Sequence, residues 1–224
     1  MKAFAALFTA VDQSTKTTVK TAALAEYFRT APDEDRLWTI ALFSGRRPKR
    51  AVTTTQLREW AAERAGLPLW LLEESYPIVG DLAETIALLL PPATREAHHS
   101  LTSWLEALSD MHNRELEARK AFILDAWDQL DETGRFLFNK LITGGFRIGV
   151  SRKLMTRALA QATGQDEAAL ALRLMGDWTP QSTSWHALVE SPDPEENESR
   201  PYPFYLAYQL DDGPESLGPP EDWL

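Results

Sequence analysis

The residues best suited to chemistry in this 224-residue chain form one glycine-rich, basic segment, Gly144-Gly145-Phe146-Arg147-Ile148-Gly149-Val150-Ser151-Arg152-Lys153. Glycines allow backbone N–H groups to approach an anion closely. A helix predicted to begin near Ser151 would point its free N–H groups and its positive dipole end toward the same place. The segment therefore has the parts of a phosphate clamp, built from Gly145, Arg147, Gly149, Ser151, Arg152 and Lys153. The same residues also fit a helix C-cap, a tight turn and solvated charges.

Two other segments combine bases with turn-forming residues. The segment 44–50 holds four bases, namely Arg46, Arg47, Lys49 and Arg50. The segment 14–20 alternates hydroxyl groups with lysines, namely Thr15, Lys16, Thr17 and Lys20. Both are candidate phosphate-binding segments, and an ordinary solvated loop is the alternative for each.

The net charge of −10 argues against a nucleic-acid partner only if it is evenly spread, and it is not. Residues 191–224 hold nine of the 33 acids and one of the 23 bases, so residues 1–190 hold 24 acids and 22 bases. Two stretches contain bases and no acid: residues 37–58, and residues 133–165 with Arg135, Lys140, Arg147, Arg152, Lys153 and Arg157. Local field matters more than net charge for a polyanionic partner.

Other chemistries find no support in the sequence. The four histidines lack metal-ligand spacing, and the chain has no cysteine. It contains no Gly-x-Ser-x-Gly elbow and no Walker-type glycine loop. No apolar run approaches the roughly 18–20 residues that a membrane span needs. We therefore expect no complete active site, cofactor, metal or membrane partner in this chain.

The elements that must position these segments are predicted to be helices. Apolar residues recur at three- and four-residue spacing, as in Phe4-Leu7-Phe8-Val11, and no stretch alternates long enough to predict a strand. Helix-start signals include Thr53 and Ser151, and glycines stand at the expected ends. The fold class is therefore predicted to be all-α, with about ten to twelve helices.

An internal repeat supports two related subdomains. The stretch Arg36–Gly45 aligns with Arg135–Gly144 at an offset of 99 residues. In each copy a basic loop follows, then a hydroxyl cap and a helix that ends at glycine. We predict a helical domain over 1–190, with repeat halves of roughly 16–90 and 113–190. Chance similarity between helical segments is the alternative.

After Ser191 the character of the sequence changes. Seven prolines interrupt an acidic stretch, so continuous helix is excluded there. The cluster Tyr202-Pro203-Phe204-Tyr205-Leu206-Ala207-Tyr208 is too apolar for a free linker. We predict that residues 191–224 are an extended, acidic, proline-rich segment that leads into another domain.

Three motifs resemble the ATP-dependent DNA ligases. The segment 141–151 resembles the Arg-Ile-Gly segment of their N-terminal DNA-binding domain, and Gly80-Asp81-Leu82-Ala83-Glu84 resembles a Gly-Asp helix start in its first half. The segment 202–224 resembles the lead-in to the adenylation domain of the bacterial branch.

The resemblance implies an all-helical domain with an internal pseudo-twofold that binds nicked duplex DNA across the minor groove. It implies phosphate contacts by Arg147, Gly149, Ser151, Arg152 and Lys153 and by Thr15, Lys16 and Thr17, while 46–50 is assigned by position and charge alone. It also implies a cytoplasmic, nucleoid-associated parent that joins DNA in repair, replication and recombination with ATP and Mg²⁺. The partners would be the parent's adenylation and OB-fold domains.

One departure from the family pattern limits the expected activity. The family's nucleotidyl-transfer lysine lies in a Lys-x-Asp-Gly motif, and no lysine of this chain begins one. We therefore expect a ligase fragment that binds DNA and is inactive alone. A helical-repeat protein scaffold and a helix-turn-helix regulator with sequence preference are the alternatives.

Overall fold

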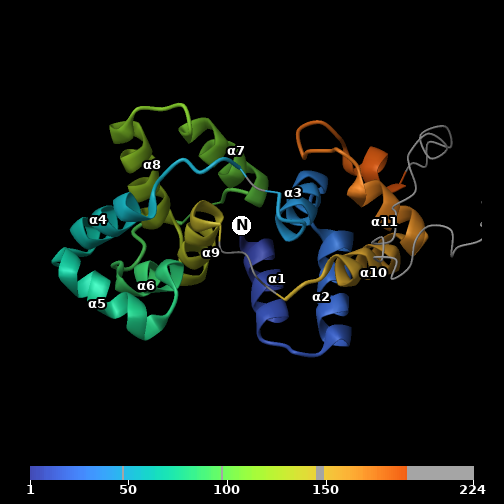
Figure 1. The fold of residues 1–224 in the computed structure, drawn as a ribbon, viewed down its shortest axis with the longest axis horizontal. Helices are drawn as coiled ribbons and strands as arrows, with labels where there is room; N and C mark the ends of the chain where they lie inside the picture. The colour runs from blue at the N-terminus through green and yellow to red at the C-terminus, as the bar shows by residue number, and fades with distance from the viewer. Residues whose placement is uncertain (47, 97, 145–148, 191–224) are drawn as a thin grey trace, which may run out of the picture. The chain divides into compact units, whose positions relative to one another are not determined.

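The computed structural model describes residues 1–190 except 47, 97 and 145–148, and the described residues form helices and loops with no strand. The elements are α1 (Lys2–Asp12), α2 (Thr17–Thr30), α3 (Asp33–Phe43), α4 (Thr54–Ala65), α5 (Leu69–Val79), α6 (Leu82–Leu89), α7 (Leu101–Met111), α8 (Leu116–Gln129), α9 (Glu132–Thr143), α10 (Arg152–Thr163), α11 (Glu167–Met175) and the π-helical turn η1 (His186–Glu190) (Figure 1). The predicted all-α class is confirmed.

Sequence signals account for many of the helix ends. Thr53 and Gln56 form a reciprocal capping box at the start of α4, and the hydroxyl of Ser151 accepts from the N–H of Leu154 at 3.1 Å at the start of α10. Both helices end at a left-handed glycine, Gly66 and Gly164. The order of signals predicted for the two copies of the repeat is therefore present in the structure.

The copies differ after their third helix. Gly80 adopts φ +84° and Asp81 caps α6, accepting from the N–H of Glu84 at 3.1 Å. Gly176 instead is extended, with φ −64° and ψ 169°, and the described residues after Asp177 begin no α-helix. The carbonyl of Gly176 accepts a hydrogen bond from Arg46, which holds this segment in a loop.

The helices pack in two groups that each combine both copies of the repeat. One group contains α4, α5, α6, α8 and α9, in which α6 lies against α9. The other contains α1, α2, α3, α10 and α11, in which α2 lies against α10 (Figure 1). The contiguous halves predicted from the sequence, roughly 16–90 and 113–190, are therefore not the packing units. Helices α1 and α7 contact both groups.

The chain crosses between the groups at the two basic segments. The α3–α4 connection carries it from the second group to the first, and the α9–α10 connection carries it back (Figure 1). We call residues 44–53 the first crossover and residues 144–151 the second crossover.

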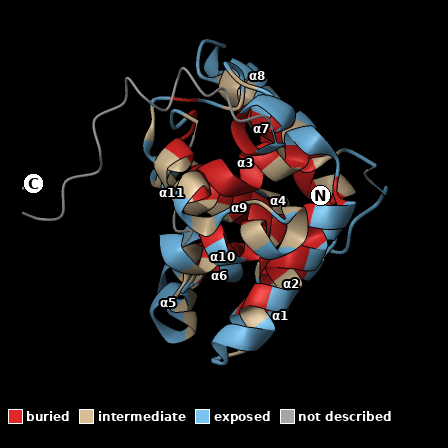
Figure 2. Ribbon diagram, turned by 90° about the vertical axis from the view of Figure 1, so that its right-hand side faces the viewer, coloured by how far each residue is buried: buried red, intermediate tan, exposed pale blue. Residues whose placement is uncertain are grey.

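One continuous apolar core runs through both groups. Four tryptophans on the helices are buried, with exposed fractions of 5% at Trp38, 6% at Trp60, 4% at Trp104 and 0% at Trp127. Buried residues occupy the inward faces of the helices in Figure 2. None of the described helices has the length and apolarity that crossing a membrane requires.

Candidate nucleic-acid interface

The second crossover touches both of the other predicted segments. At its start, the guanidinium of Arg50 donates to the carbonyl of Thr143 at 3.2 Å. At its end, the ammonium of Lys20 lies 3.5 Å from the carbonyl oxygen of Gly149. Three segments separated by up to 129 residues therefore meet at one place. We call this the basic surface. Its described members are Thr15, Lys16, Thr17, Lys20, Lys49, Arg50, Gly149, Ser151, Arg152 and Lys153.

Most of these side chains are accessible. Only Lys20 among them is partly covered, and the others are exposed. Three further predicted contacts, Arg47, Gly145 and Arg147, lie outside the described residues.

Five exposed cations of the basic surface form no ion pair within the part of the chain that the structure describes, namely Lys16, Lys49, Arg50, Arg152 and Lys153. Bases elsewhere commonly do, as Arg64 does with Asp128 at 2.6 Å and Lys120 with Glu63 at 2.6 Å. The unpaired bases therefore create a local positive field in a chain whose net charge is −10.

Two helices begin at this surface with the charge pattern that normally weakens a helix. Lys16 is the N-cap of α2, and Arg152 and Lys153 open α10. Neither helix has an acid in its first turn. Cations at a helix N-terminus oppose the macrodipole, and an anion placed there is favoured by both the dipole and the free N–H groups.

The start of α2 keeps its N–H groups available because Lys16, its N-cap, makes no side-chain capping hydrogen bond. The hydroxyl of Ser14 instead accepts from the N–H of Lys16 at 3.2 Å, which shapes the turn before the helix. The arrangement fits an anion that bridges α2 and α10.

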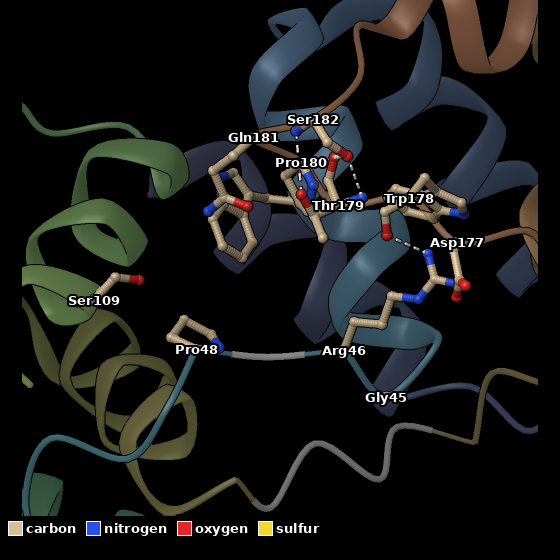
Figure 3. Close-up of a pocket in the computed structure, with 11 residues that line it drawn as sticks. Gly45, Arg46, Pro48, Ser109, Asp177, Trp178, Thr179, Pro180, Gln181 and Ser182 are labelled. Carbon is tan, nitrogen blue, oxygen red and sulfur yellow. Dashed lines mark hydrogen bonds between the residues drawn. The ribbon is translucent and has the colours of Figure 1, made fainter.

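Arg46 has a different role from the one its sequence position suggests. Its guanidinium donates to the carbonyl of Trp178 at 2.7 Å (Figure 3). It also donates to the carbonyl of Gly176 at 2.7 Å and lies 4.4 Å from the centre of the Trp178 ring. These intramolecular contacts connect the first crossover to the loop after α11. Lys49 and Arg50 are the described bases of that crossover that face solvent.

Several bases of the 133–165 stretch are also committed within the fold. Arg135 is 3% exposed and donates to the carbonyls of Trp127 and Pro91, each at 2.6 Å. Burial lowers its pKa. Lys140 pairs with Asp81, and Arg157 with Glu167 at 3.8 Å. The charge count therefore overstated the surface field of this stretch.

The α7–α8 turn borders the first crossover, although no sequence motif predicted a role for it. Arg119 donates to the carbonyl of Ala51 at 2.9 Å, and a ring nitrogen of His112 lies 3.3 Å from the carbonyl oxygen of Arg50. The exposed Arg114 belongs to the same turn. In the sequence, the only signal is a pair of bases around a turn. The contact of this turn with residues some 60 positions earlier depends on the fold, so local sequence could not predict it.

The family comparison agrees with the motifs and the fold. The family described as the DNA ligase N terminus matches residues 1–160, which include α1 to α9 and both crossovers. The chain belongs to this family. A role in DNA binding by a DNA ligase follows from that membership. No curated protein matches the chain in the comparison.

Neither a metal-binding cluster among the described residues nor the family's nucleotidyl-transfer motif is found in this chain. No group of three or more His, Asp or Glu among the described residues is placed to hold a metal ion. The 224 residues contain no Lys-x-Asp-Gly motif.

Proposed function

We propose that the basic surface holds duplex DNA through phosphate contacts, without reading its sequence, in the minor groove beside a nick. The observation that carries the proposal is the meeting of three segments. Their exposed cations Lys16, Lys49, Arg50, Arg152 and Lys153 form no ion pair within the described structure. Contacts to phosphates fix position on a duplex but carry no direct sequence information.

Backbone N–H groups at the starts of two helices support this assignment. The starts of α2 and α10 both supply N–H donors, and the Lys20–Gly149 contact brings them together. Successive phosphates along one strand would meet the α2 turn and the second crossover, and Lys49 and Arg50 would reach the backbone from the first crossover. Arg114 extends the same surface and is a further candidate.

A salt titration of binding to a nicked duplex tests the proposal. We expect log affinity to fall with log salt with a slope of about −3 to −6, from roughly 0.9 per phosphate neutralised. The double reversals Arg152→Glu/Lys153→Glu and Lys49→Glu/Arg50→Glu should each weaken binding and flatten the slope by about two units.

The matched control is the double reversal Arg29→Glu/Arg95→Glu, which changes the net charge equally at exposed positions outside the basic surface. It should leave the slope unchanged. Equal losses in all three variants would show that net charge, and not this surface, governs binding. Strong discrimination between unrelated duplexes would favour a regulator that reads bases.

We also propose that this chain contributes DNA binding to a ligase whose joining reaction, with ATP and Mg²⁺, depends on adenylation and OB-fold domains. The absent Lys-x-Asp-Gly motif supports this assignment. The purified chain should form no lysine–AMP adduct when incubated with ATP and Mg²⁺, because it lacks the nucleophile in its motif. Mass spectrometry checks this, and a stable adduct on any of its lysines would overturn the assignment.

A further inference from the structure

Helix α5 carries a second exposed surface, which is rich in apolar side chains. Of the eight large apolar side chains that are exposed among the described residues, four lie on α5: Leu69, Trp70, Tyr76 and Ile78. Trp70 is 63% exposed and Ile78 is 86% exposed. Leu72 is the one buried residue of α5, and most of that helix is drawn as exposed in Figure 2. Clustered exposed apolar residues mark interaction sites, whereas isolated ones are ordinary.

The exposed residues of α5 form two rows with the same pattern. Residues three or four positions apart share one side of a helix. Trp70, Glu74 and Ile78 make one such row, and Leu69, Glu73 and Tyr76 make the other. In each row a carboxylate lies between two apolar side chains. A row of this length spans about 12 Å, from a rise of about 1.5 Å per residue.

The surface is acidic as well as apolar. Residues 65–94 contain four acids, Glu73, Glu74, Asp81 and Glu84, and no base. Glu73 lies 3.6 Å from Arg58 of α4 and Asp81 pairs with Lys140, whereas Glu74 forms no ion pair with a described residue. A polyanion is repelled here, and two copies of the surface would repel each other.

The neighbours of α5 leave these rows open. Its substantial packing contacts within the described structure are with α4 and α6. The described residues offer no sheet edge to which a strand could add. A partner must therefore pack side chains against the helix, and an amphipathic helix is the element that presents apolar residues at matching three- and four-residue spacing.

We propose that the exposed surface of α5 docks a basic amphipathic helix of a protein partner. On its docking face, the partner helix carries a Lys or Arg. An apolar residue lies four positions before this cation and another lies four positions after it. Its cation faces Glu74, and its apolar residues cover Trp70 and Ile78. This docking is separate from DNA binding, because none of these residues belongs to the basic surface.

The test uses a defined probe, a fluorescein-labelled helical peptide of Leu and Lys with Leu-x-x-x-Lys-x-x-x-Leu spacing, and its counterpart with Glu in place of Lys. Fluorescence anisotropy with the full chain should show binding of the Lys peptide only. Trp70→Ser/Ile78→Ser should weaken that binding by roughly tenfold or more, and Glu74→Lys should weaken it independently. Binding of both peptides alike would overturn the proposal.

Matched controls remove the same kinds of side chain elsewhere. Leu116→Ser/Met175→Ser replaces exposed apolar residues on α8 and α11, and Glu117→Lys reverses a charge on α8. These variants should bind the Lys peptide as the unaltered chain does. Equal losses in the control and test variants would overturn the proposal.

Two further measurements separate this surface from other occupants and from the DNA-binding proposal. Sedimentation of the unaltered chain should show no concentration-dependent association through this surface. An association that Trp70→Ser/Ile78→Ser abolishes would instead assign the surface to a second copy of the chain. Nicked-duplex affinity of the same variant should be unchanged, so the two proposals fail independently. Because both side chains are exposed, the variant should keep its helical circular dichroism, and Glu74→Lys gives an independent test of the same surface.

Discussion

Bases that look equivalent along the chain have different surroundings once it is folded. Arg46 and Lys49 lie three positions apart in one basic segment, yet Arg46 is bonded to two carbonyls some 130 residues away and Lys49 is exposed. Composition predicts that such a segment is positive. It cannot predict which cations remain available, because the competing carbonyl acceptors come from a distant loop.

Substitution of the two residues should separate these roles. Arg46→Ala removes two hydrogen bonds from a charged donor and the contact with the Trp178 ring, so the free energy of unfolding should fall by about 1–3 kcal/mol. Lys49→Glu should change it by no more than about 0.5 kcal/mol. Thermal or denaturant unfolding measures both.

DNA affinity should respond in the opposite order. Lys49→Glu should weaken binding to the nicked duplex and flatten its salt slope, whereas folded Arg46→Ala should retain most of the slope. A larger loss of slope in Arg46→Ala would restore Arg46 as a phosphate contact.

At the scale of elements, local signals predicted more than long-range packing did. Caps such as Thr53 and Ser151 act within three residues, so sequence alone located the starts of α4 and α10. Each packing group combines helices from both copies of the repeat, because α2 packs against α10 and α6 packs against α9. An amphipathic pattern predicts which face of a helix is buried but not which helix packs against it. The sequence therefore predicts two basic loops but not their proximity.

Substitution of Gly149 tests whether the backbone geometry of the second crossover is needed for DNA binding. It has φ +60°, and a Cβ there would lie 3.1 Å from the ammonium nitrogen of Lys20. Gly149→Ala should cost about 1–2 kcal/mol in the left-handed region. It should also displace Lys20, so binding to the nicked duplex should weaken.

Gly164→Ala is the matched control, since Gly164 has φ +73° with open space where the Cβ would lie. It should lose similar stability, measured by thermal unfolding, and keep its DNA affinity. Equal affinity losses in the two variants would mean that stability, not the geometry at Lys20, controls binding.

At the scale of the whole molecule, charge is unevenly distributed along the sequence. The basic surface and the acidic α5 face both belong to residues 1–190, in which acids and bases nearly balance. The net charge of −10 therefore comes mainly from the end of the chain and says little about the surface that meets DNA.

Removal of residues 191–224 tests this division. The shortened chain loses nine acids and one base, and its net charge changes from −10 to −2. It should remain folded, because the described residues within 1–190 bury an apolar core among themselves. Less long-range repulsion of the phosphates should tighten binding at low salt, and the gain should shrink as the Debye length falls from about 30 Å at 0.01 M to about 8 Å at 0.15 M. Titrations of both chains with one nicked duplex measure the effect. A folded shortened chain that no longer binds would place essential contacts after residue 190 and contradict the assignment of binding to the basic surface.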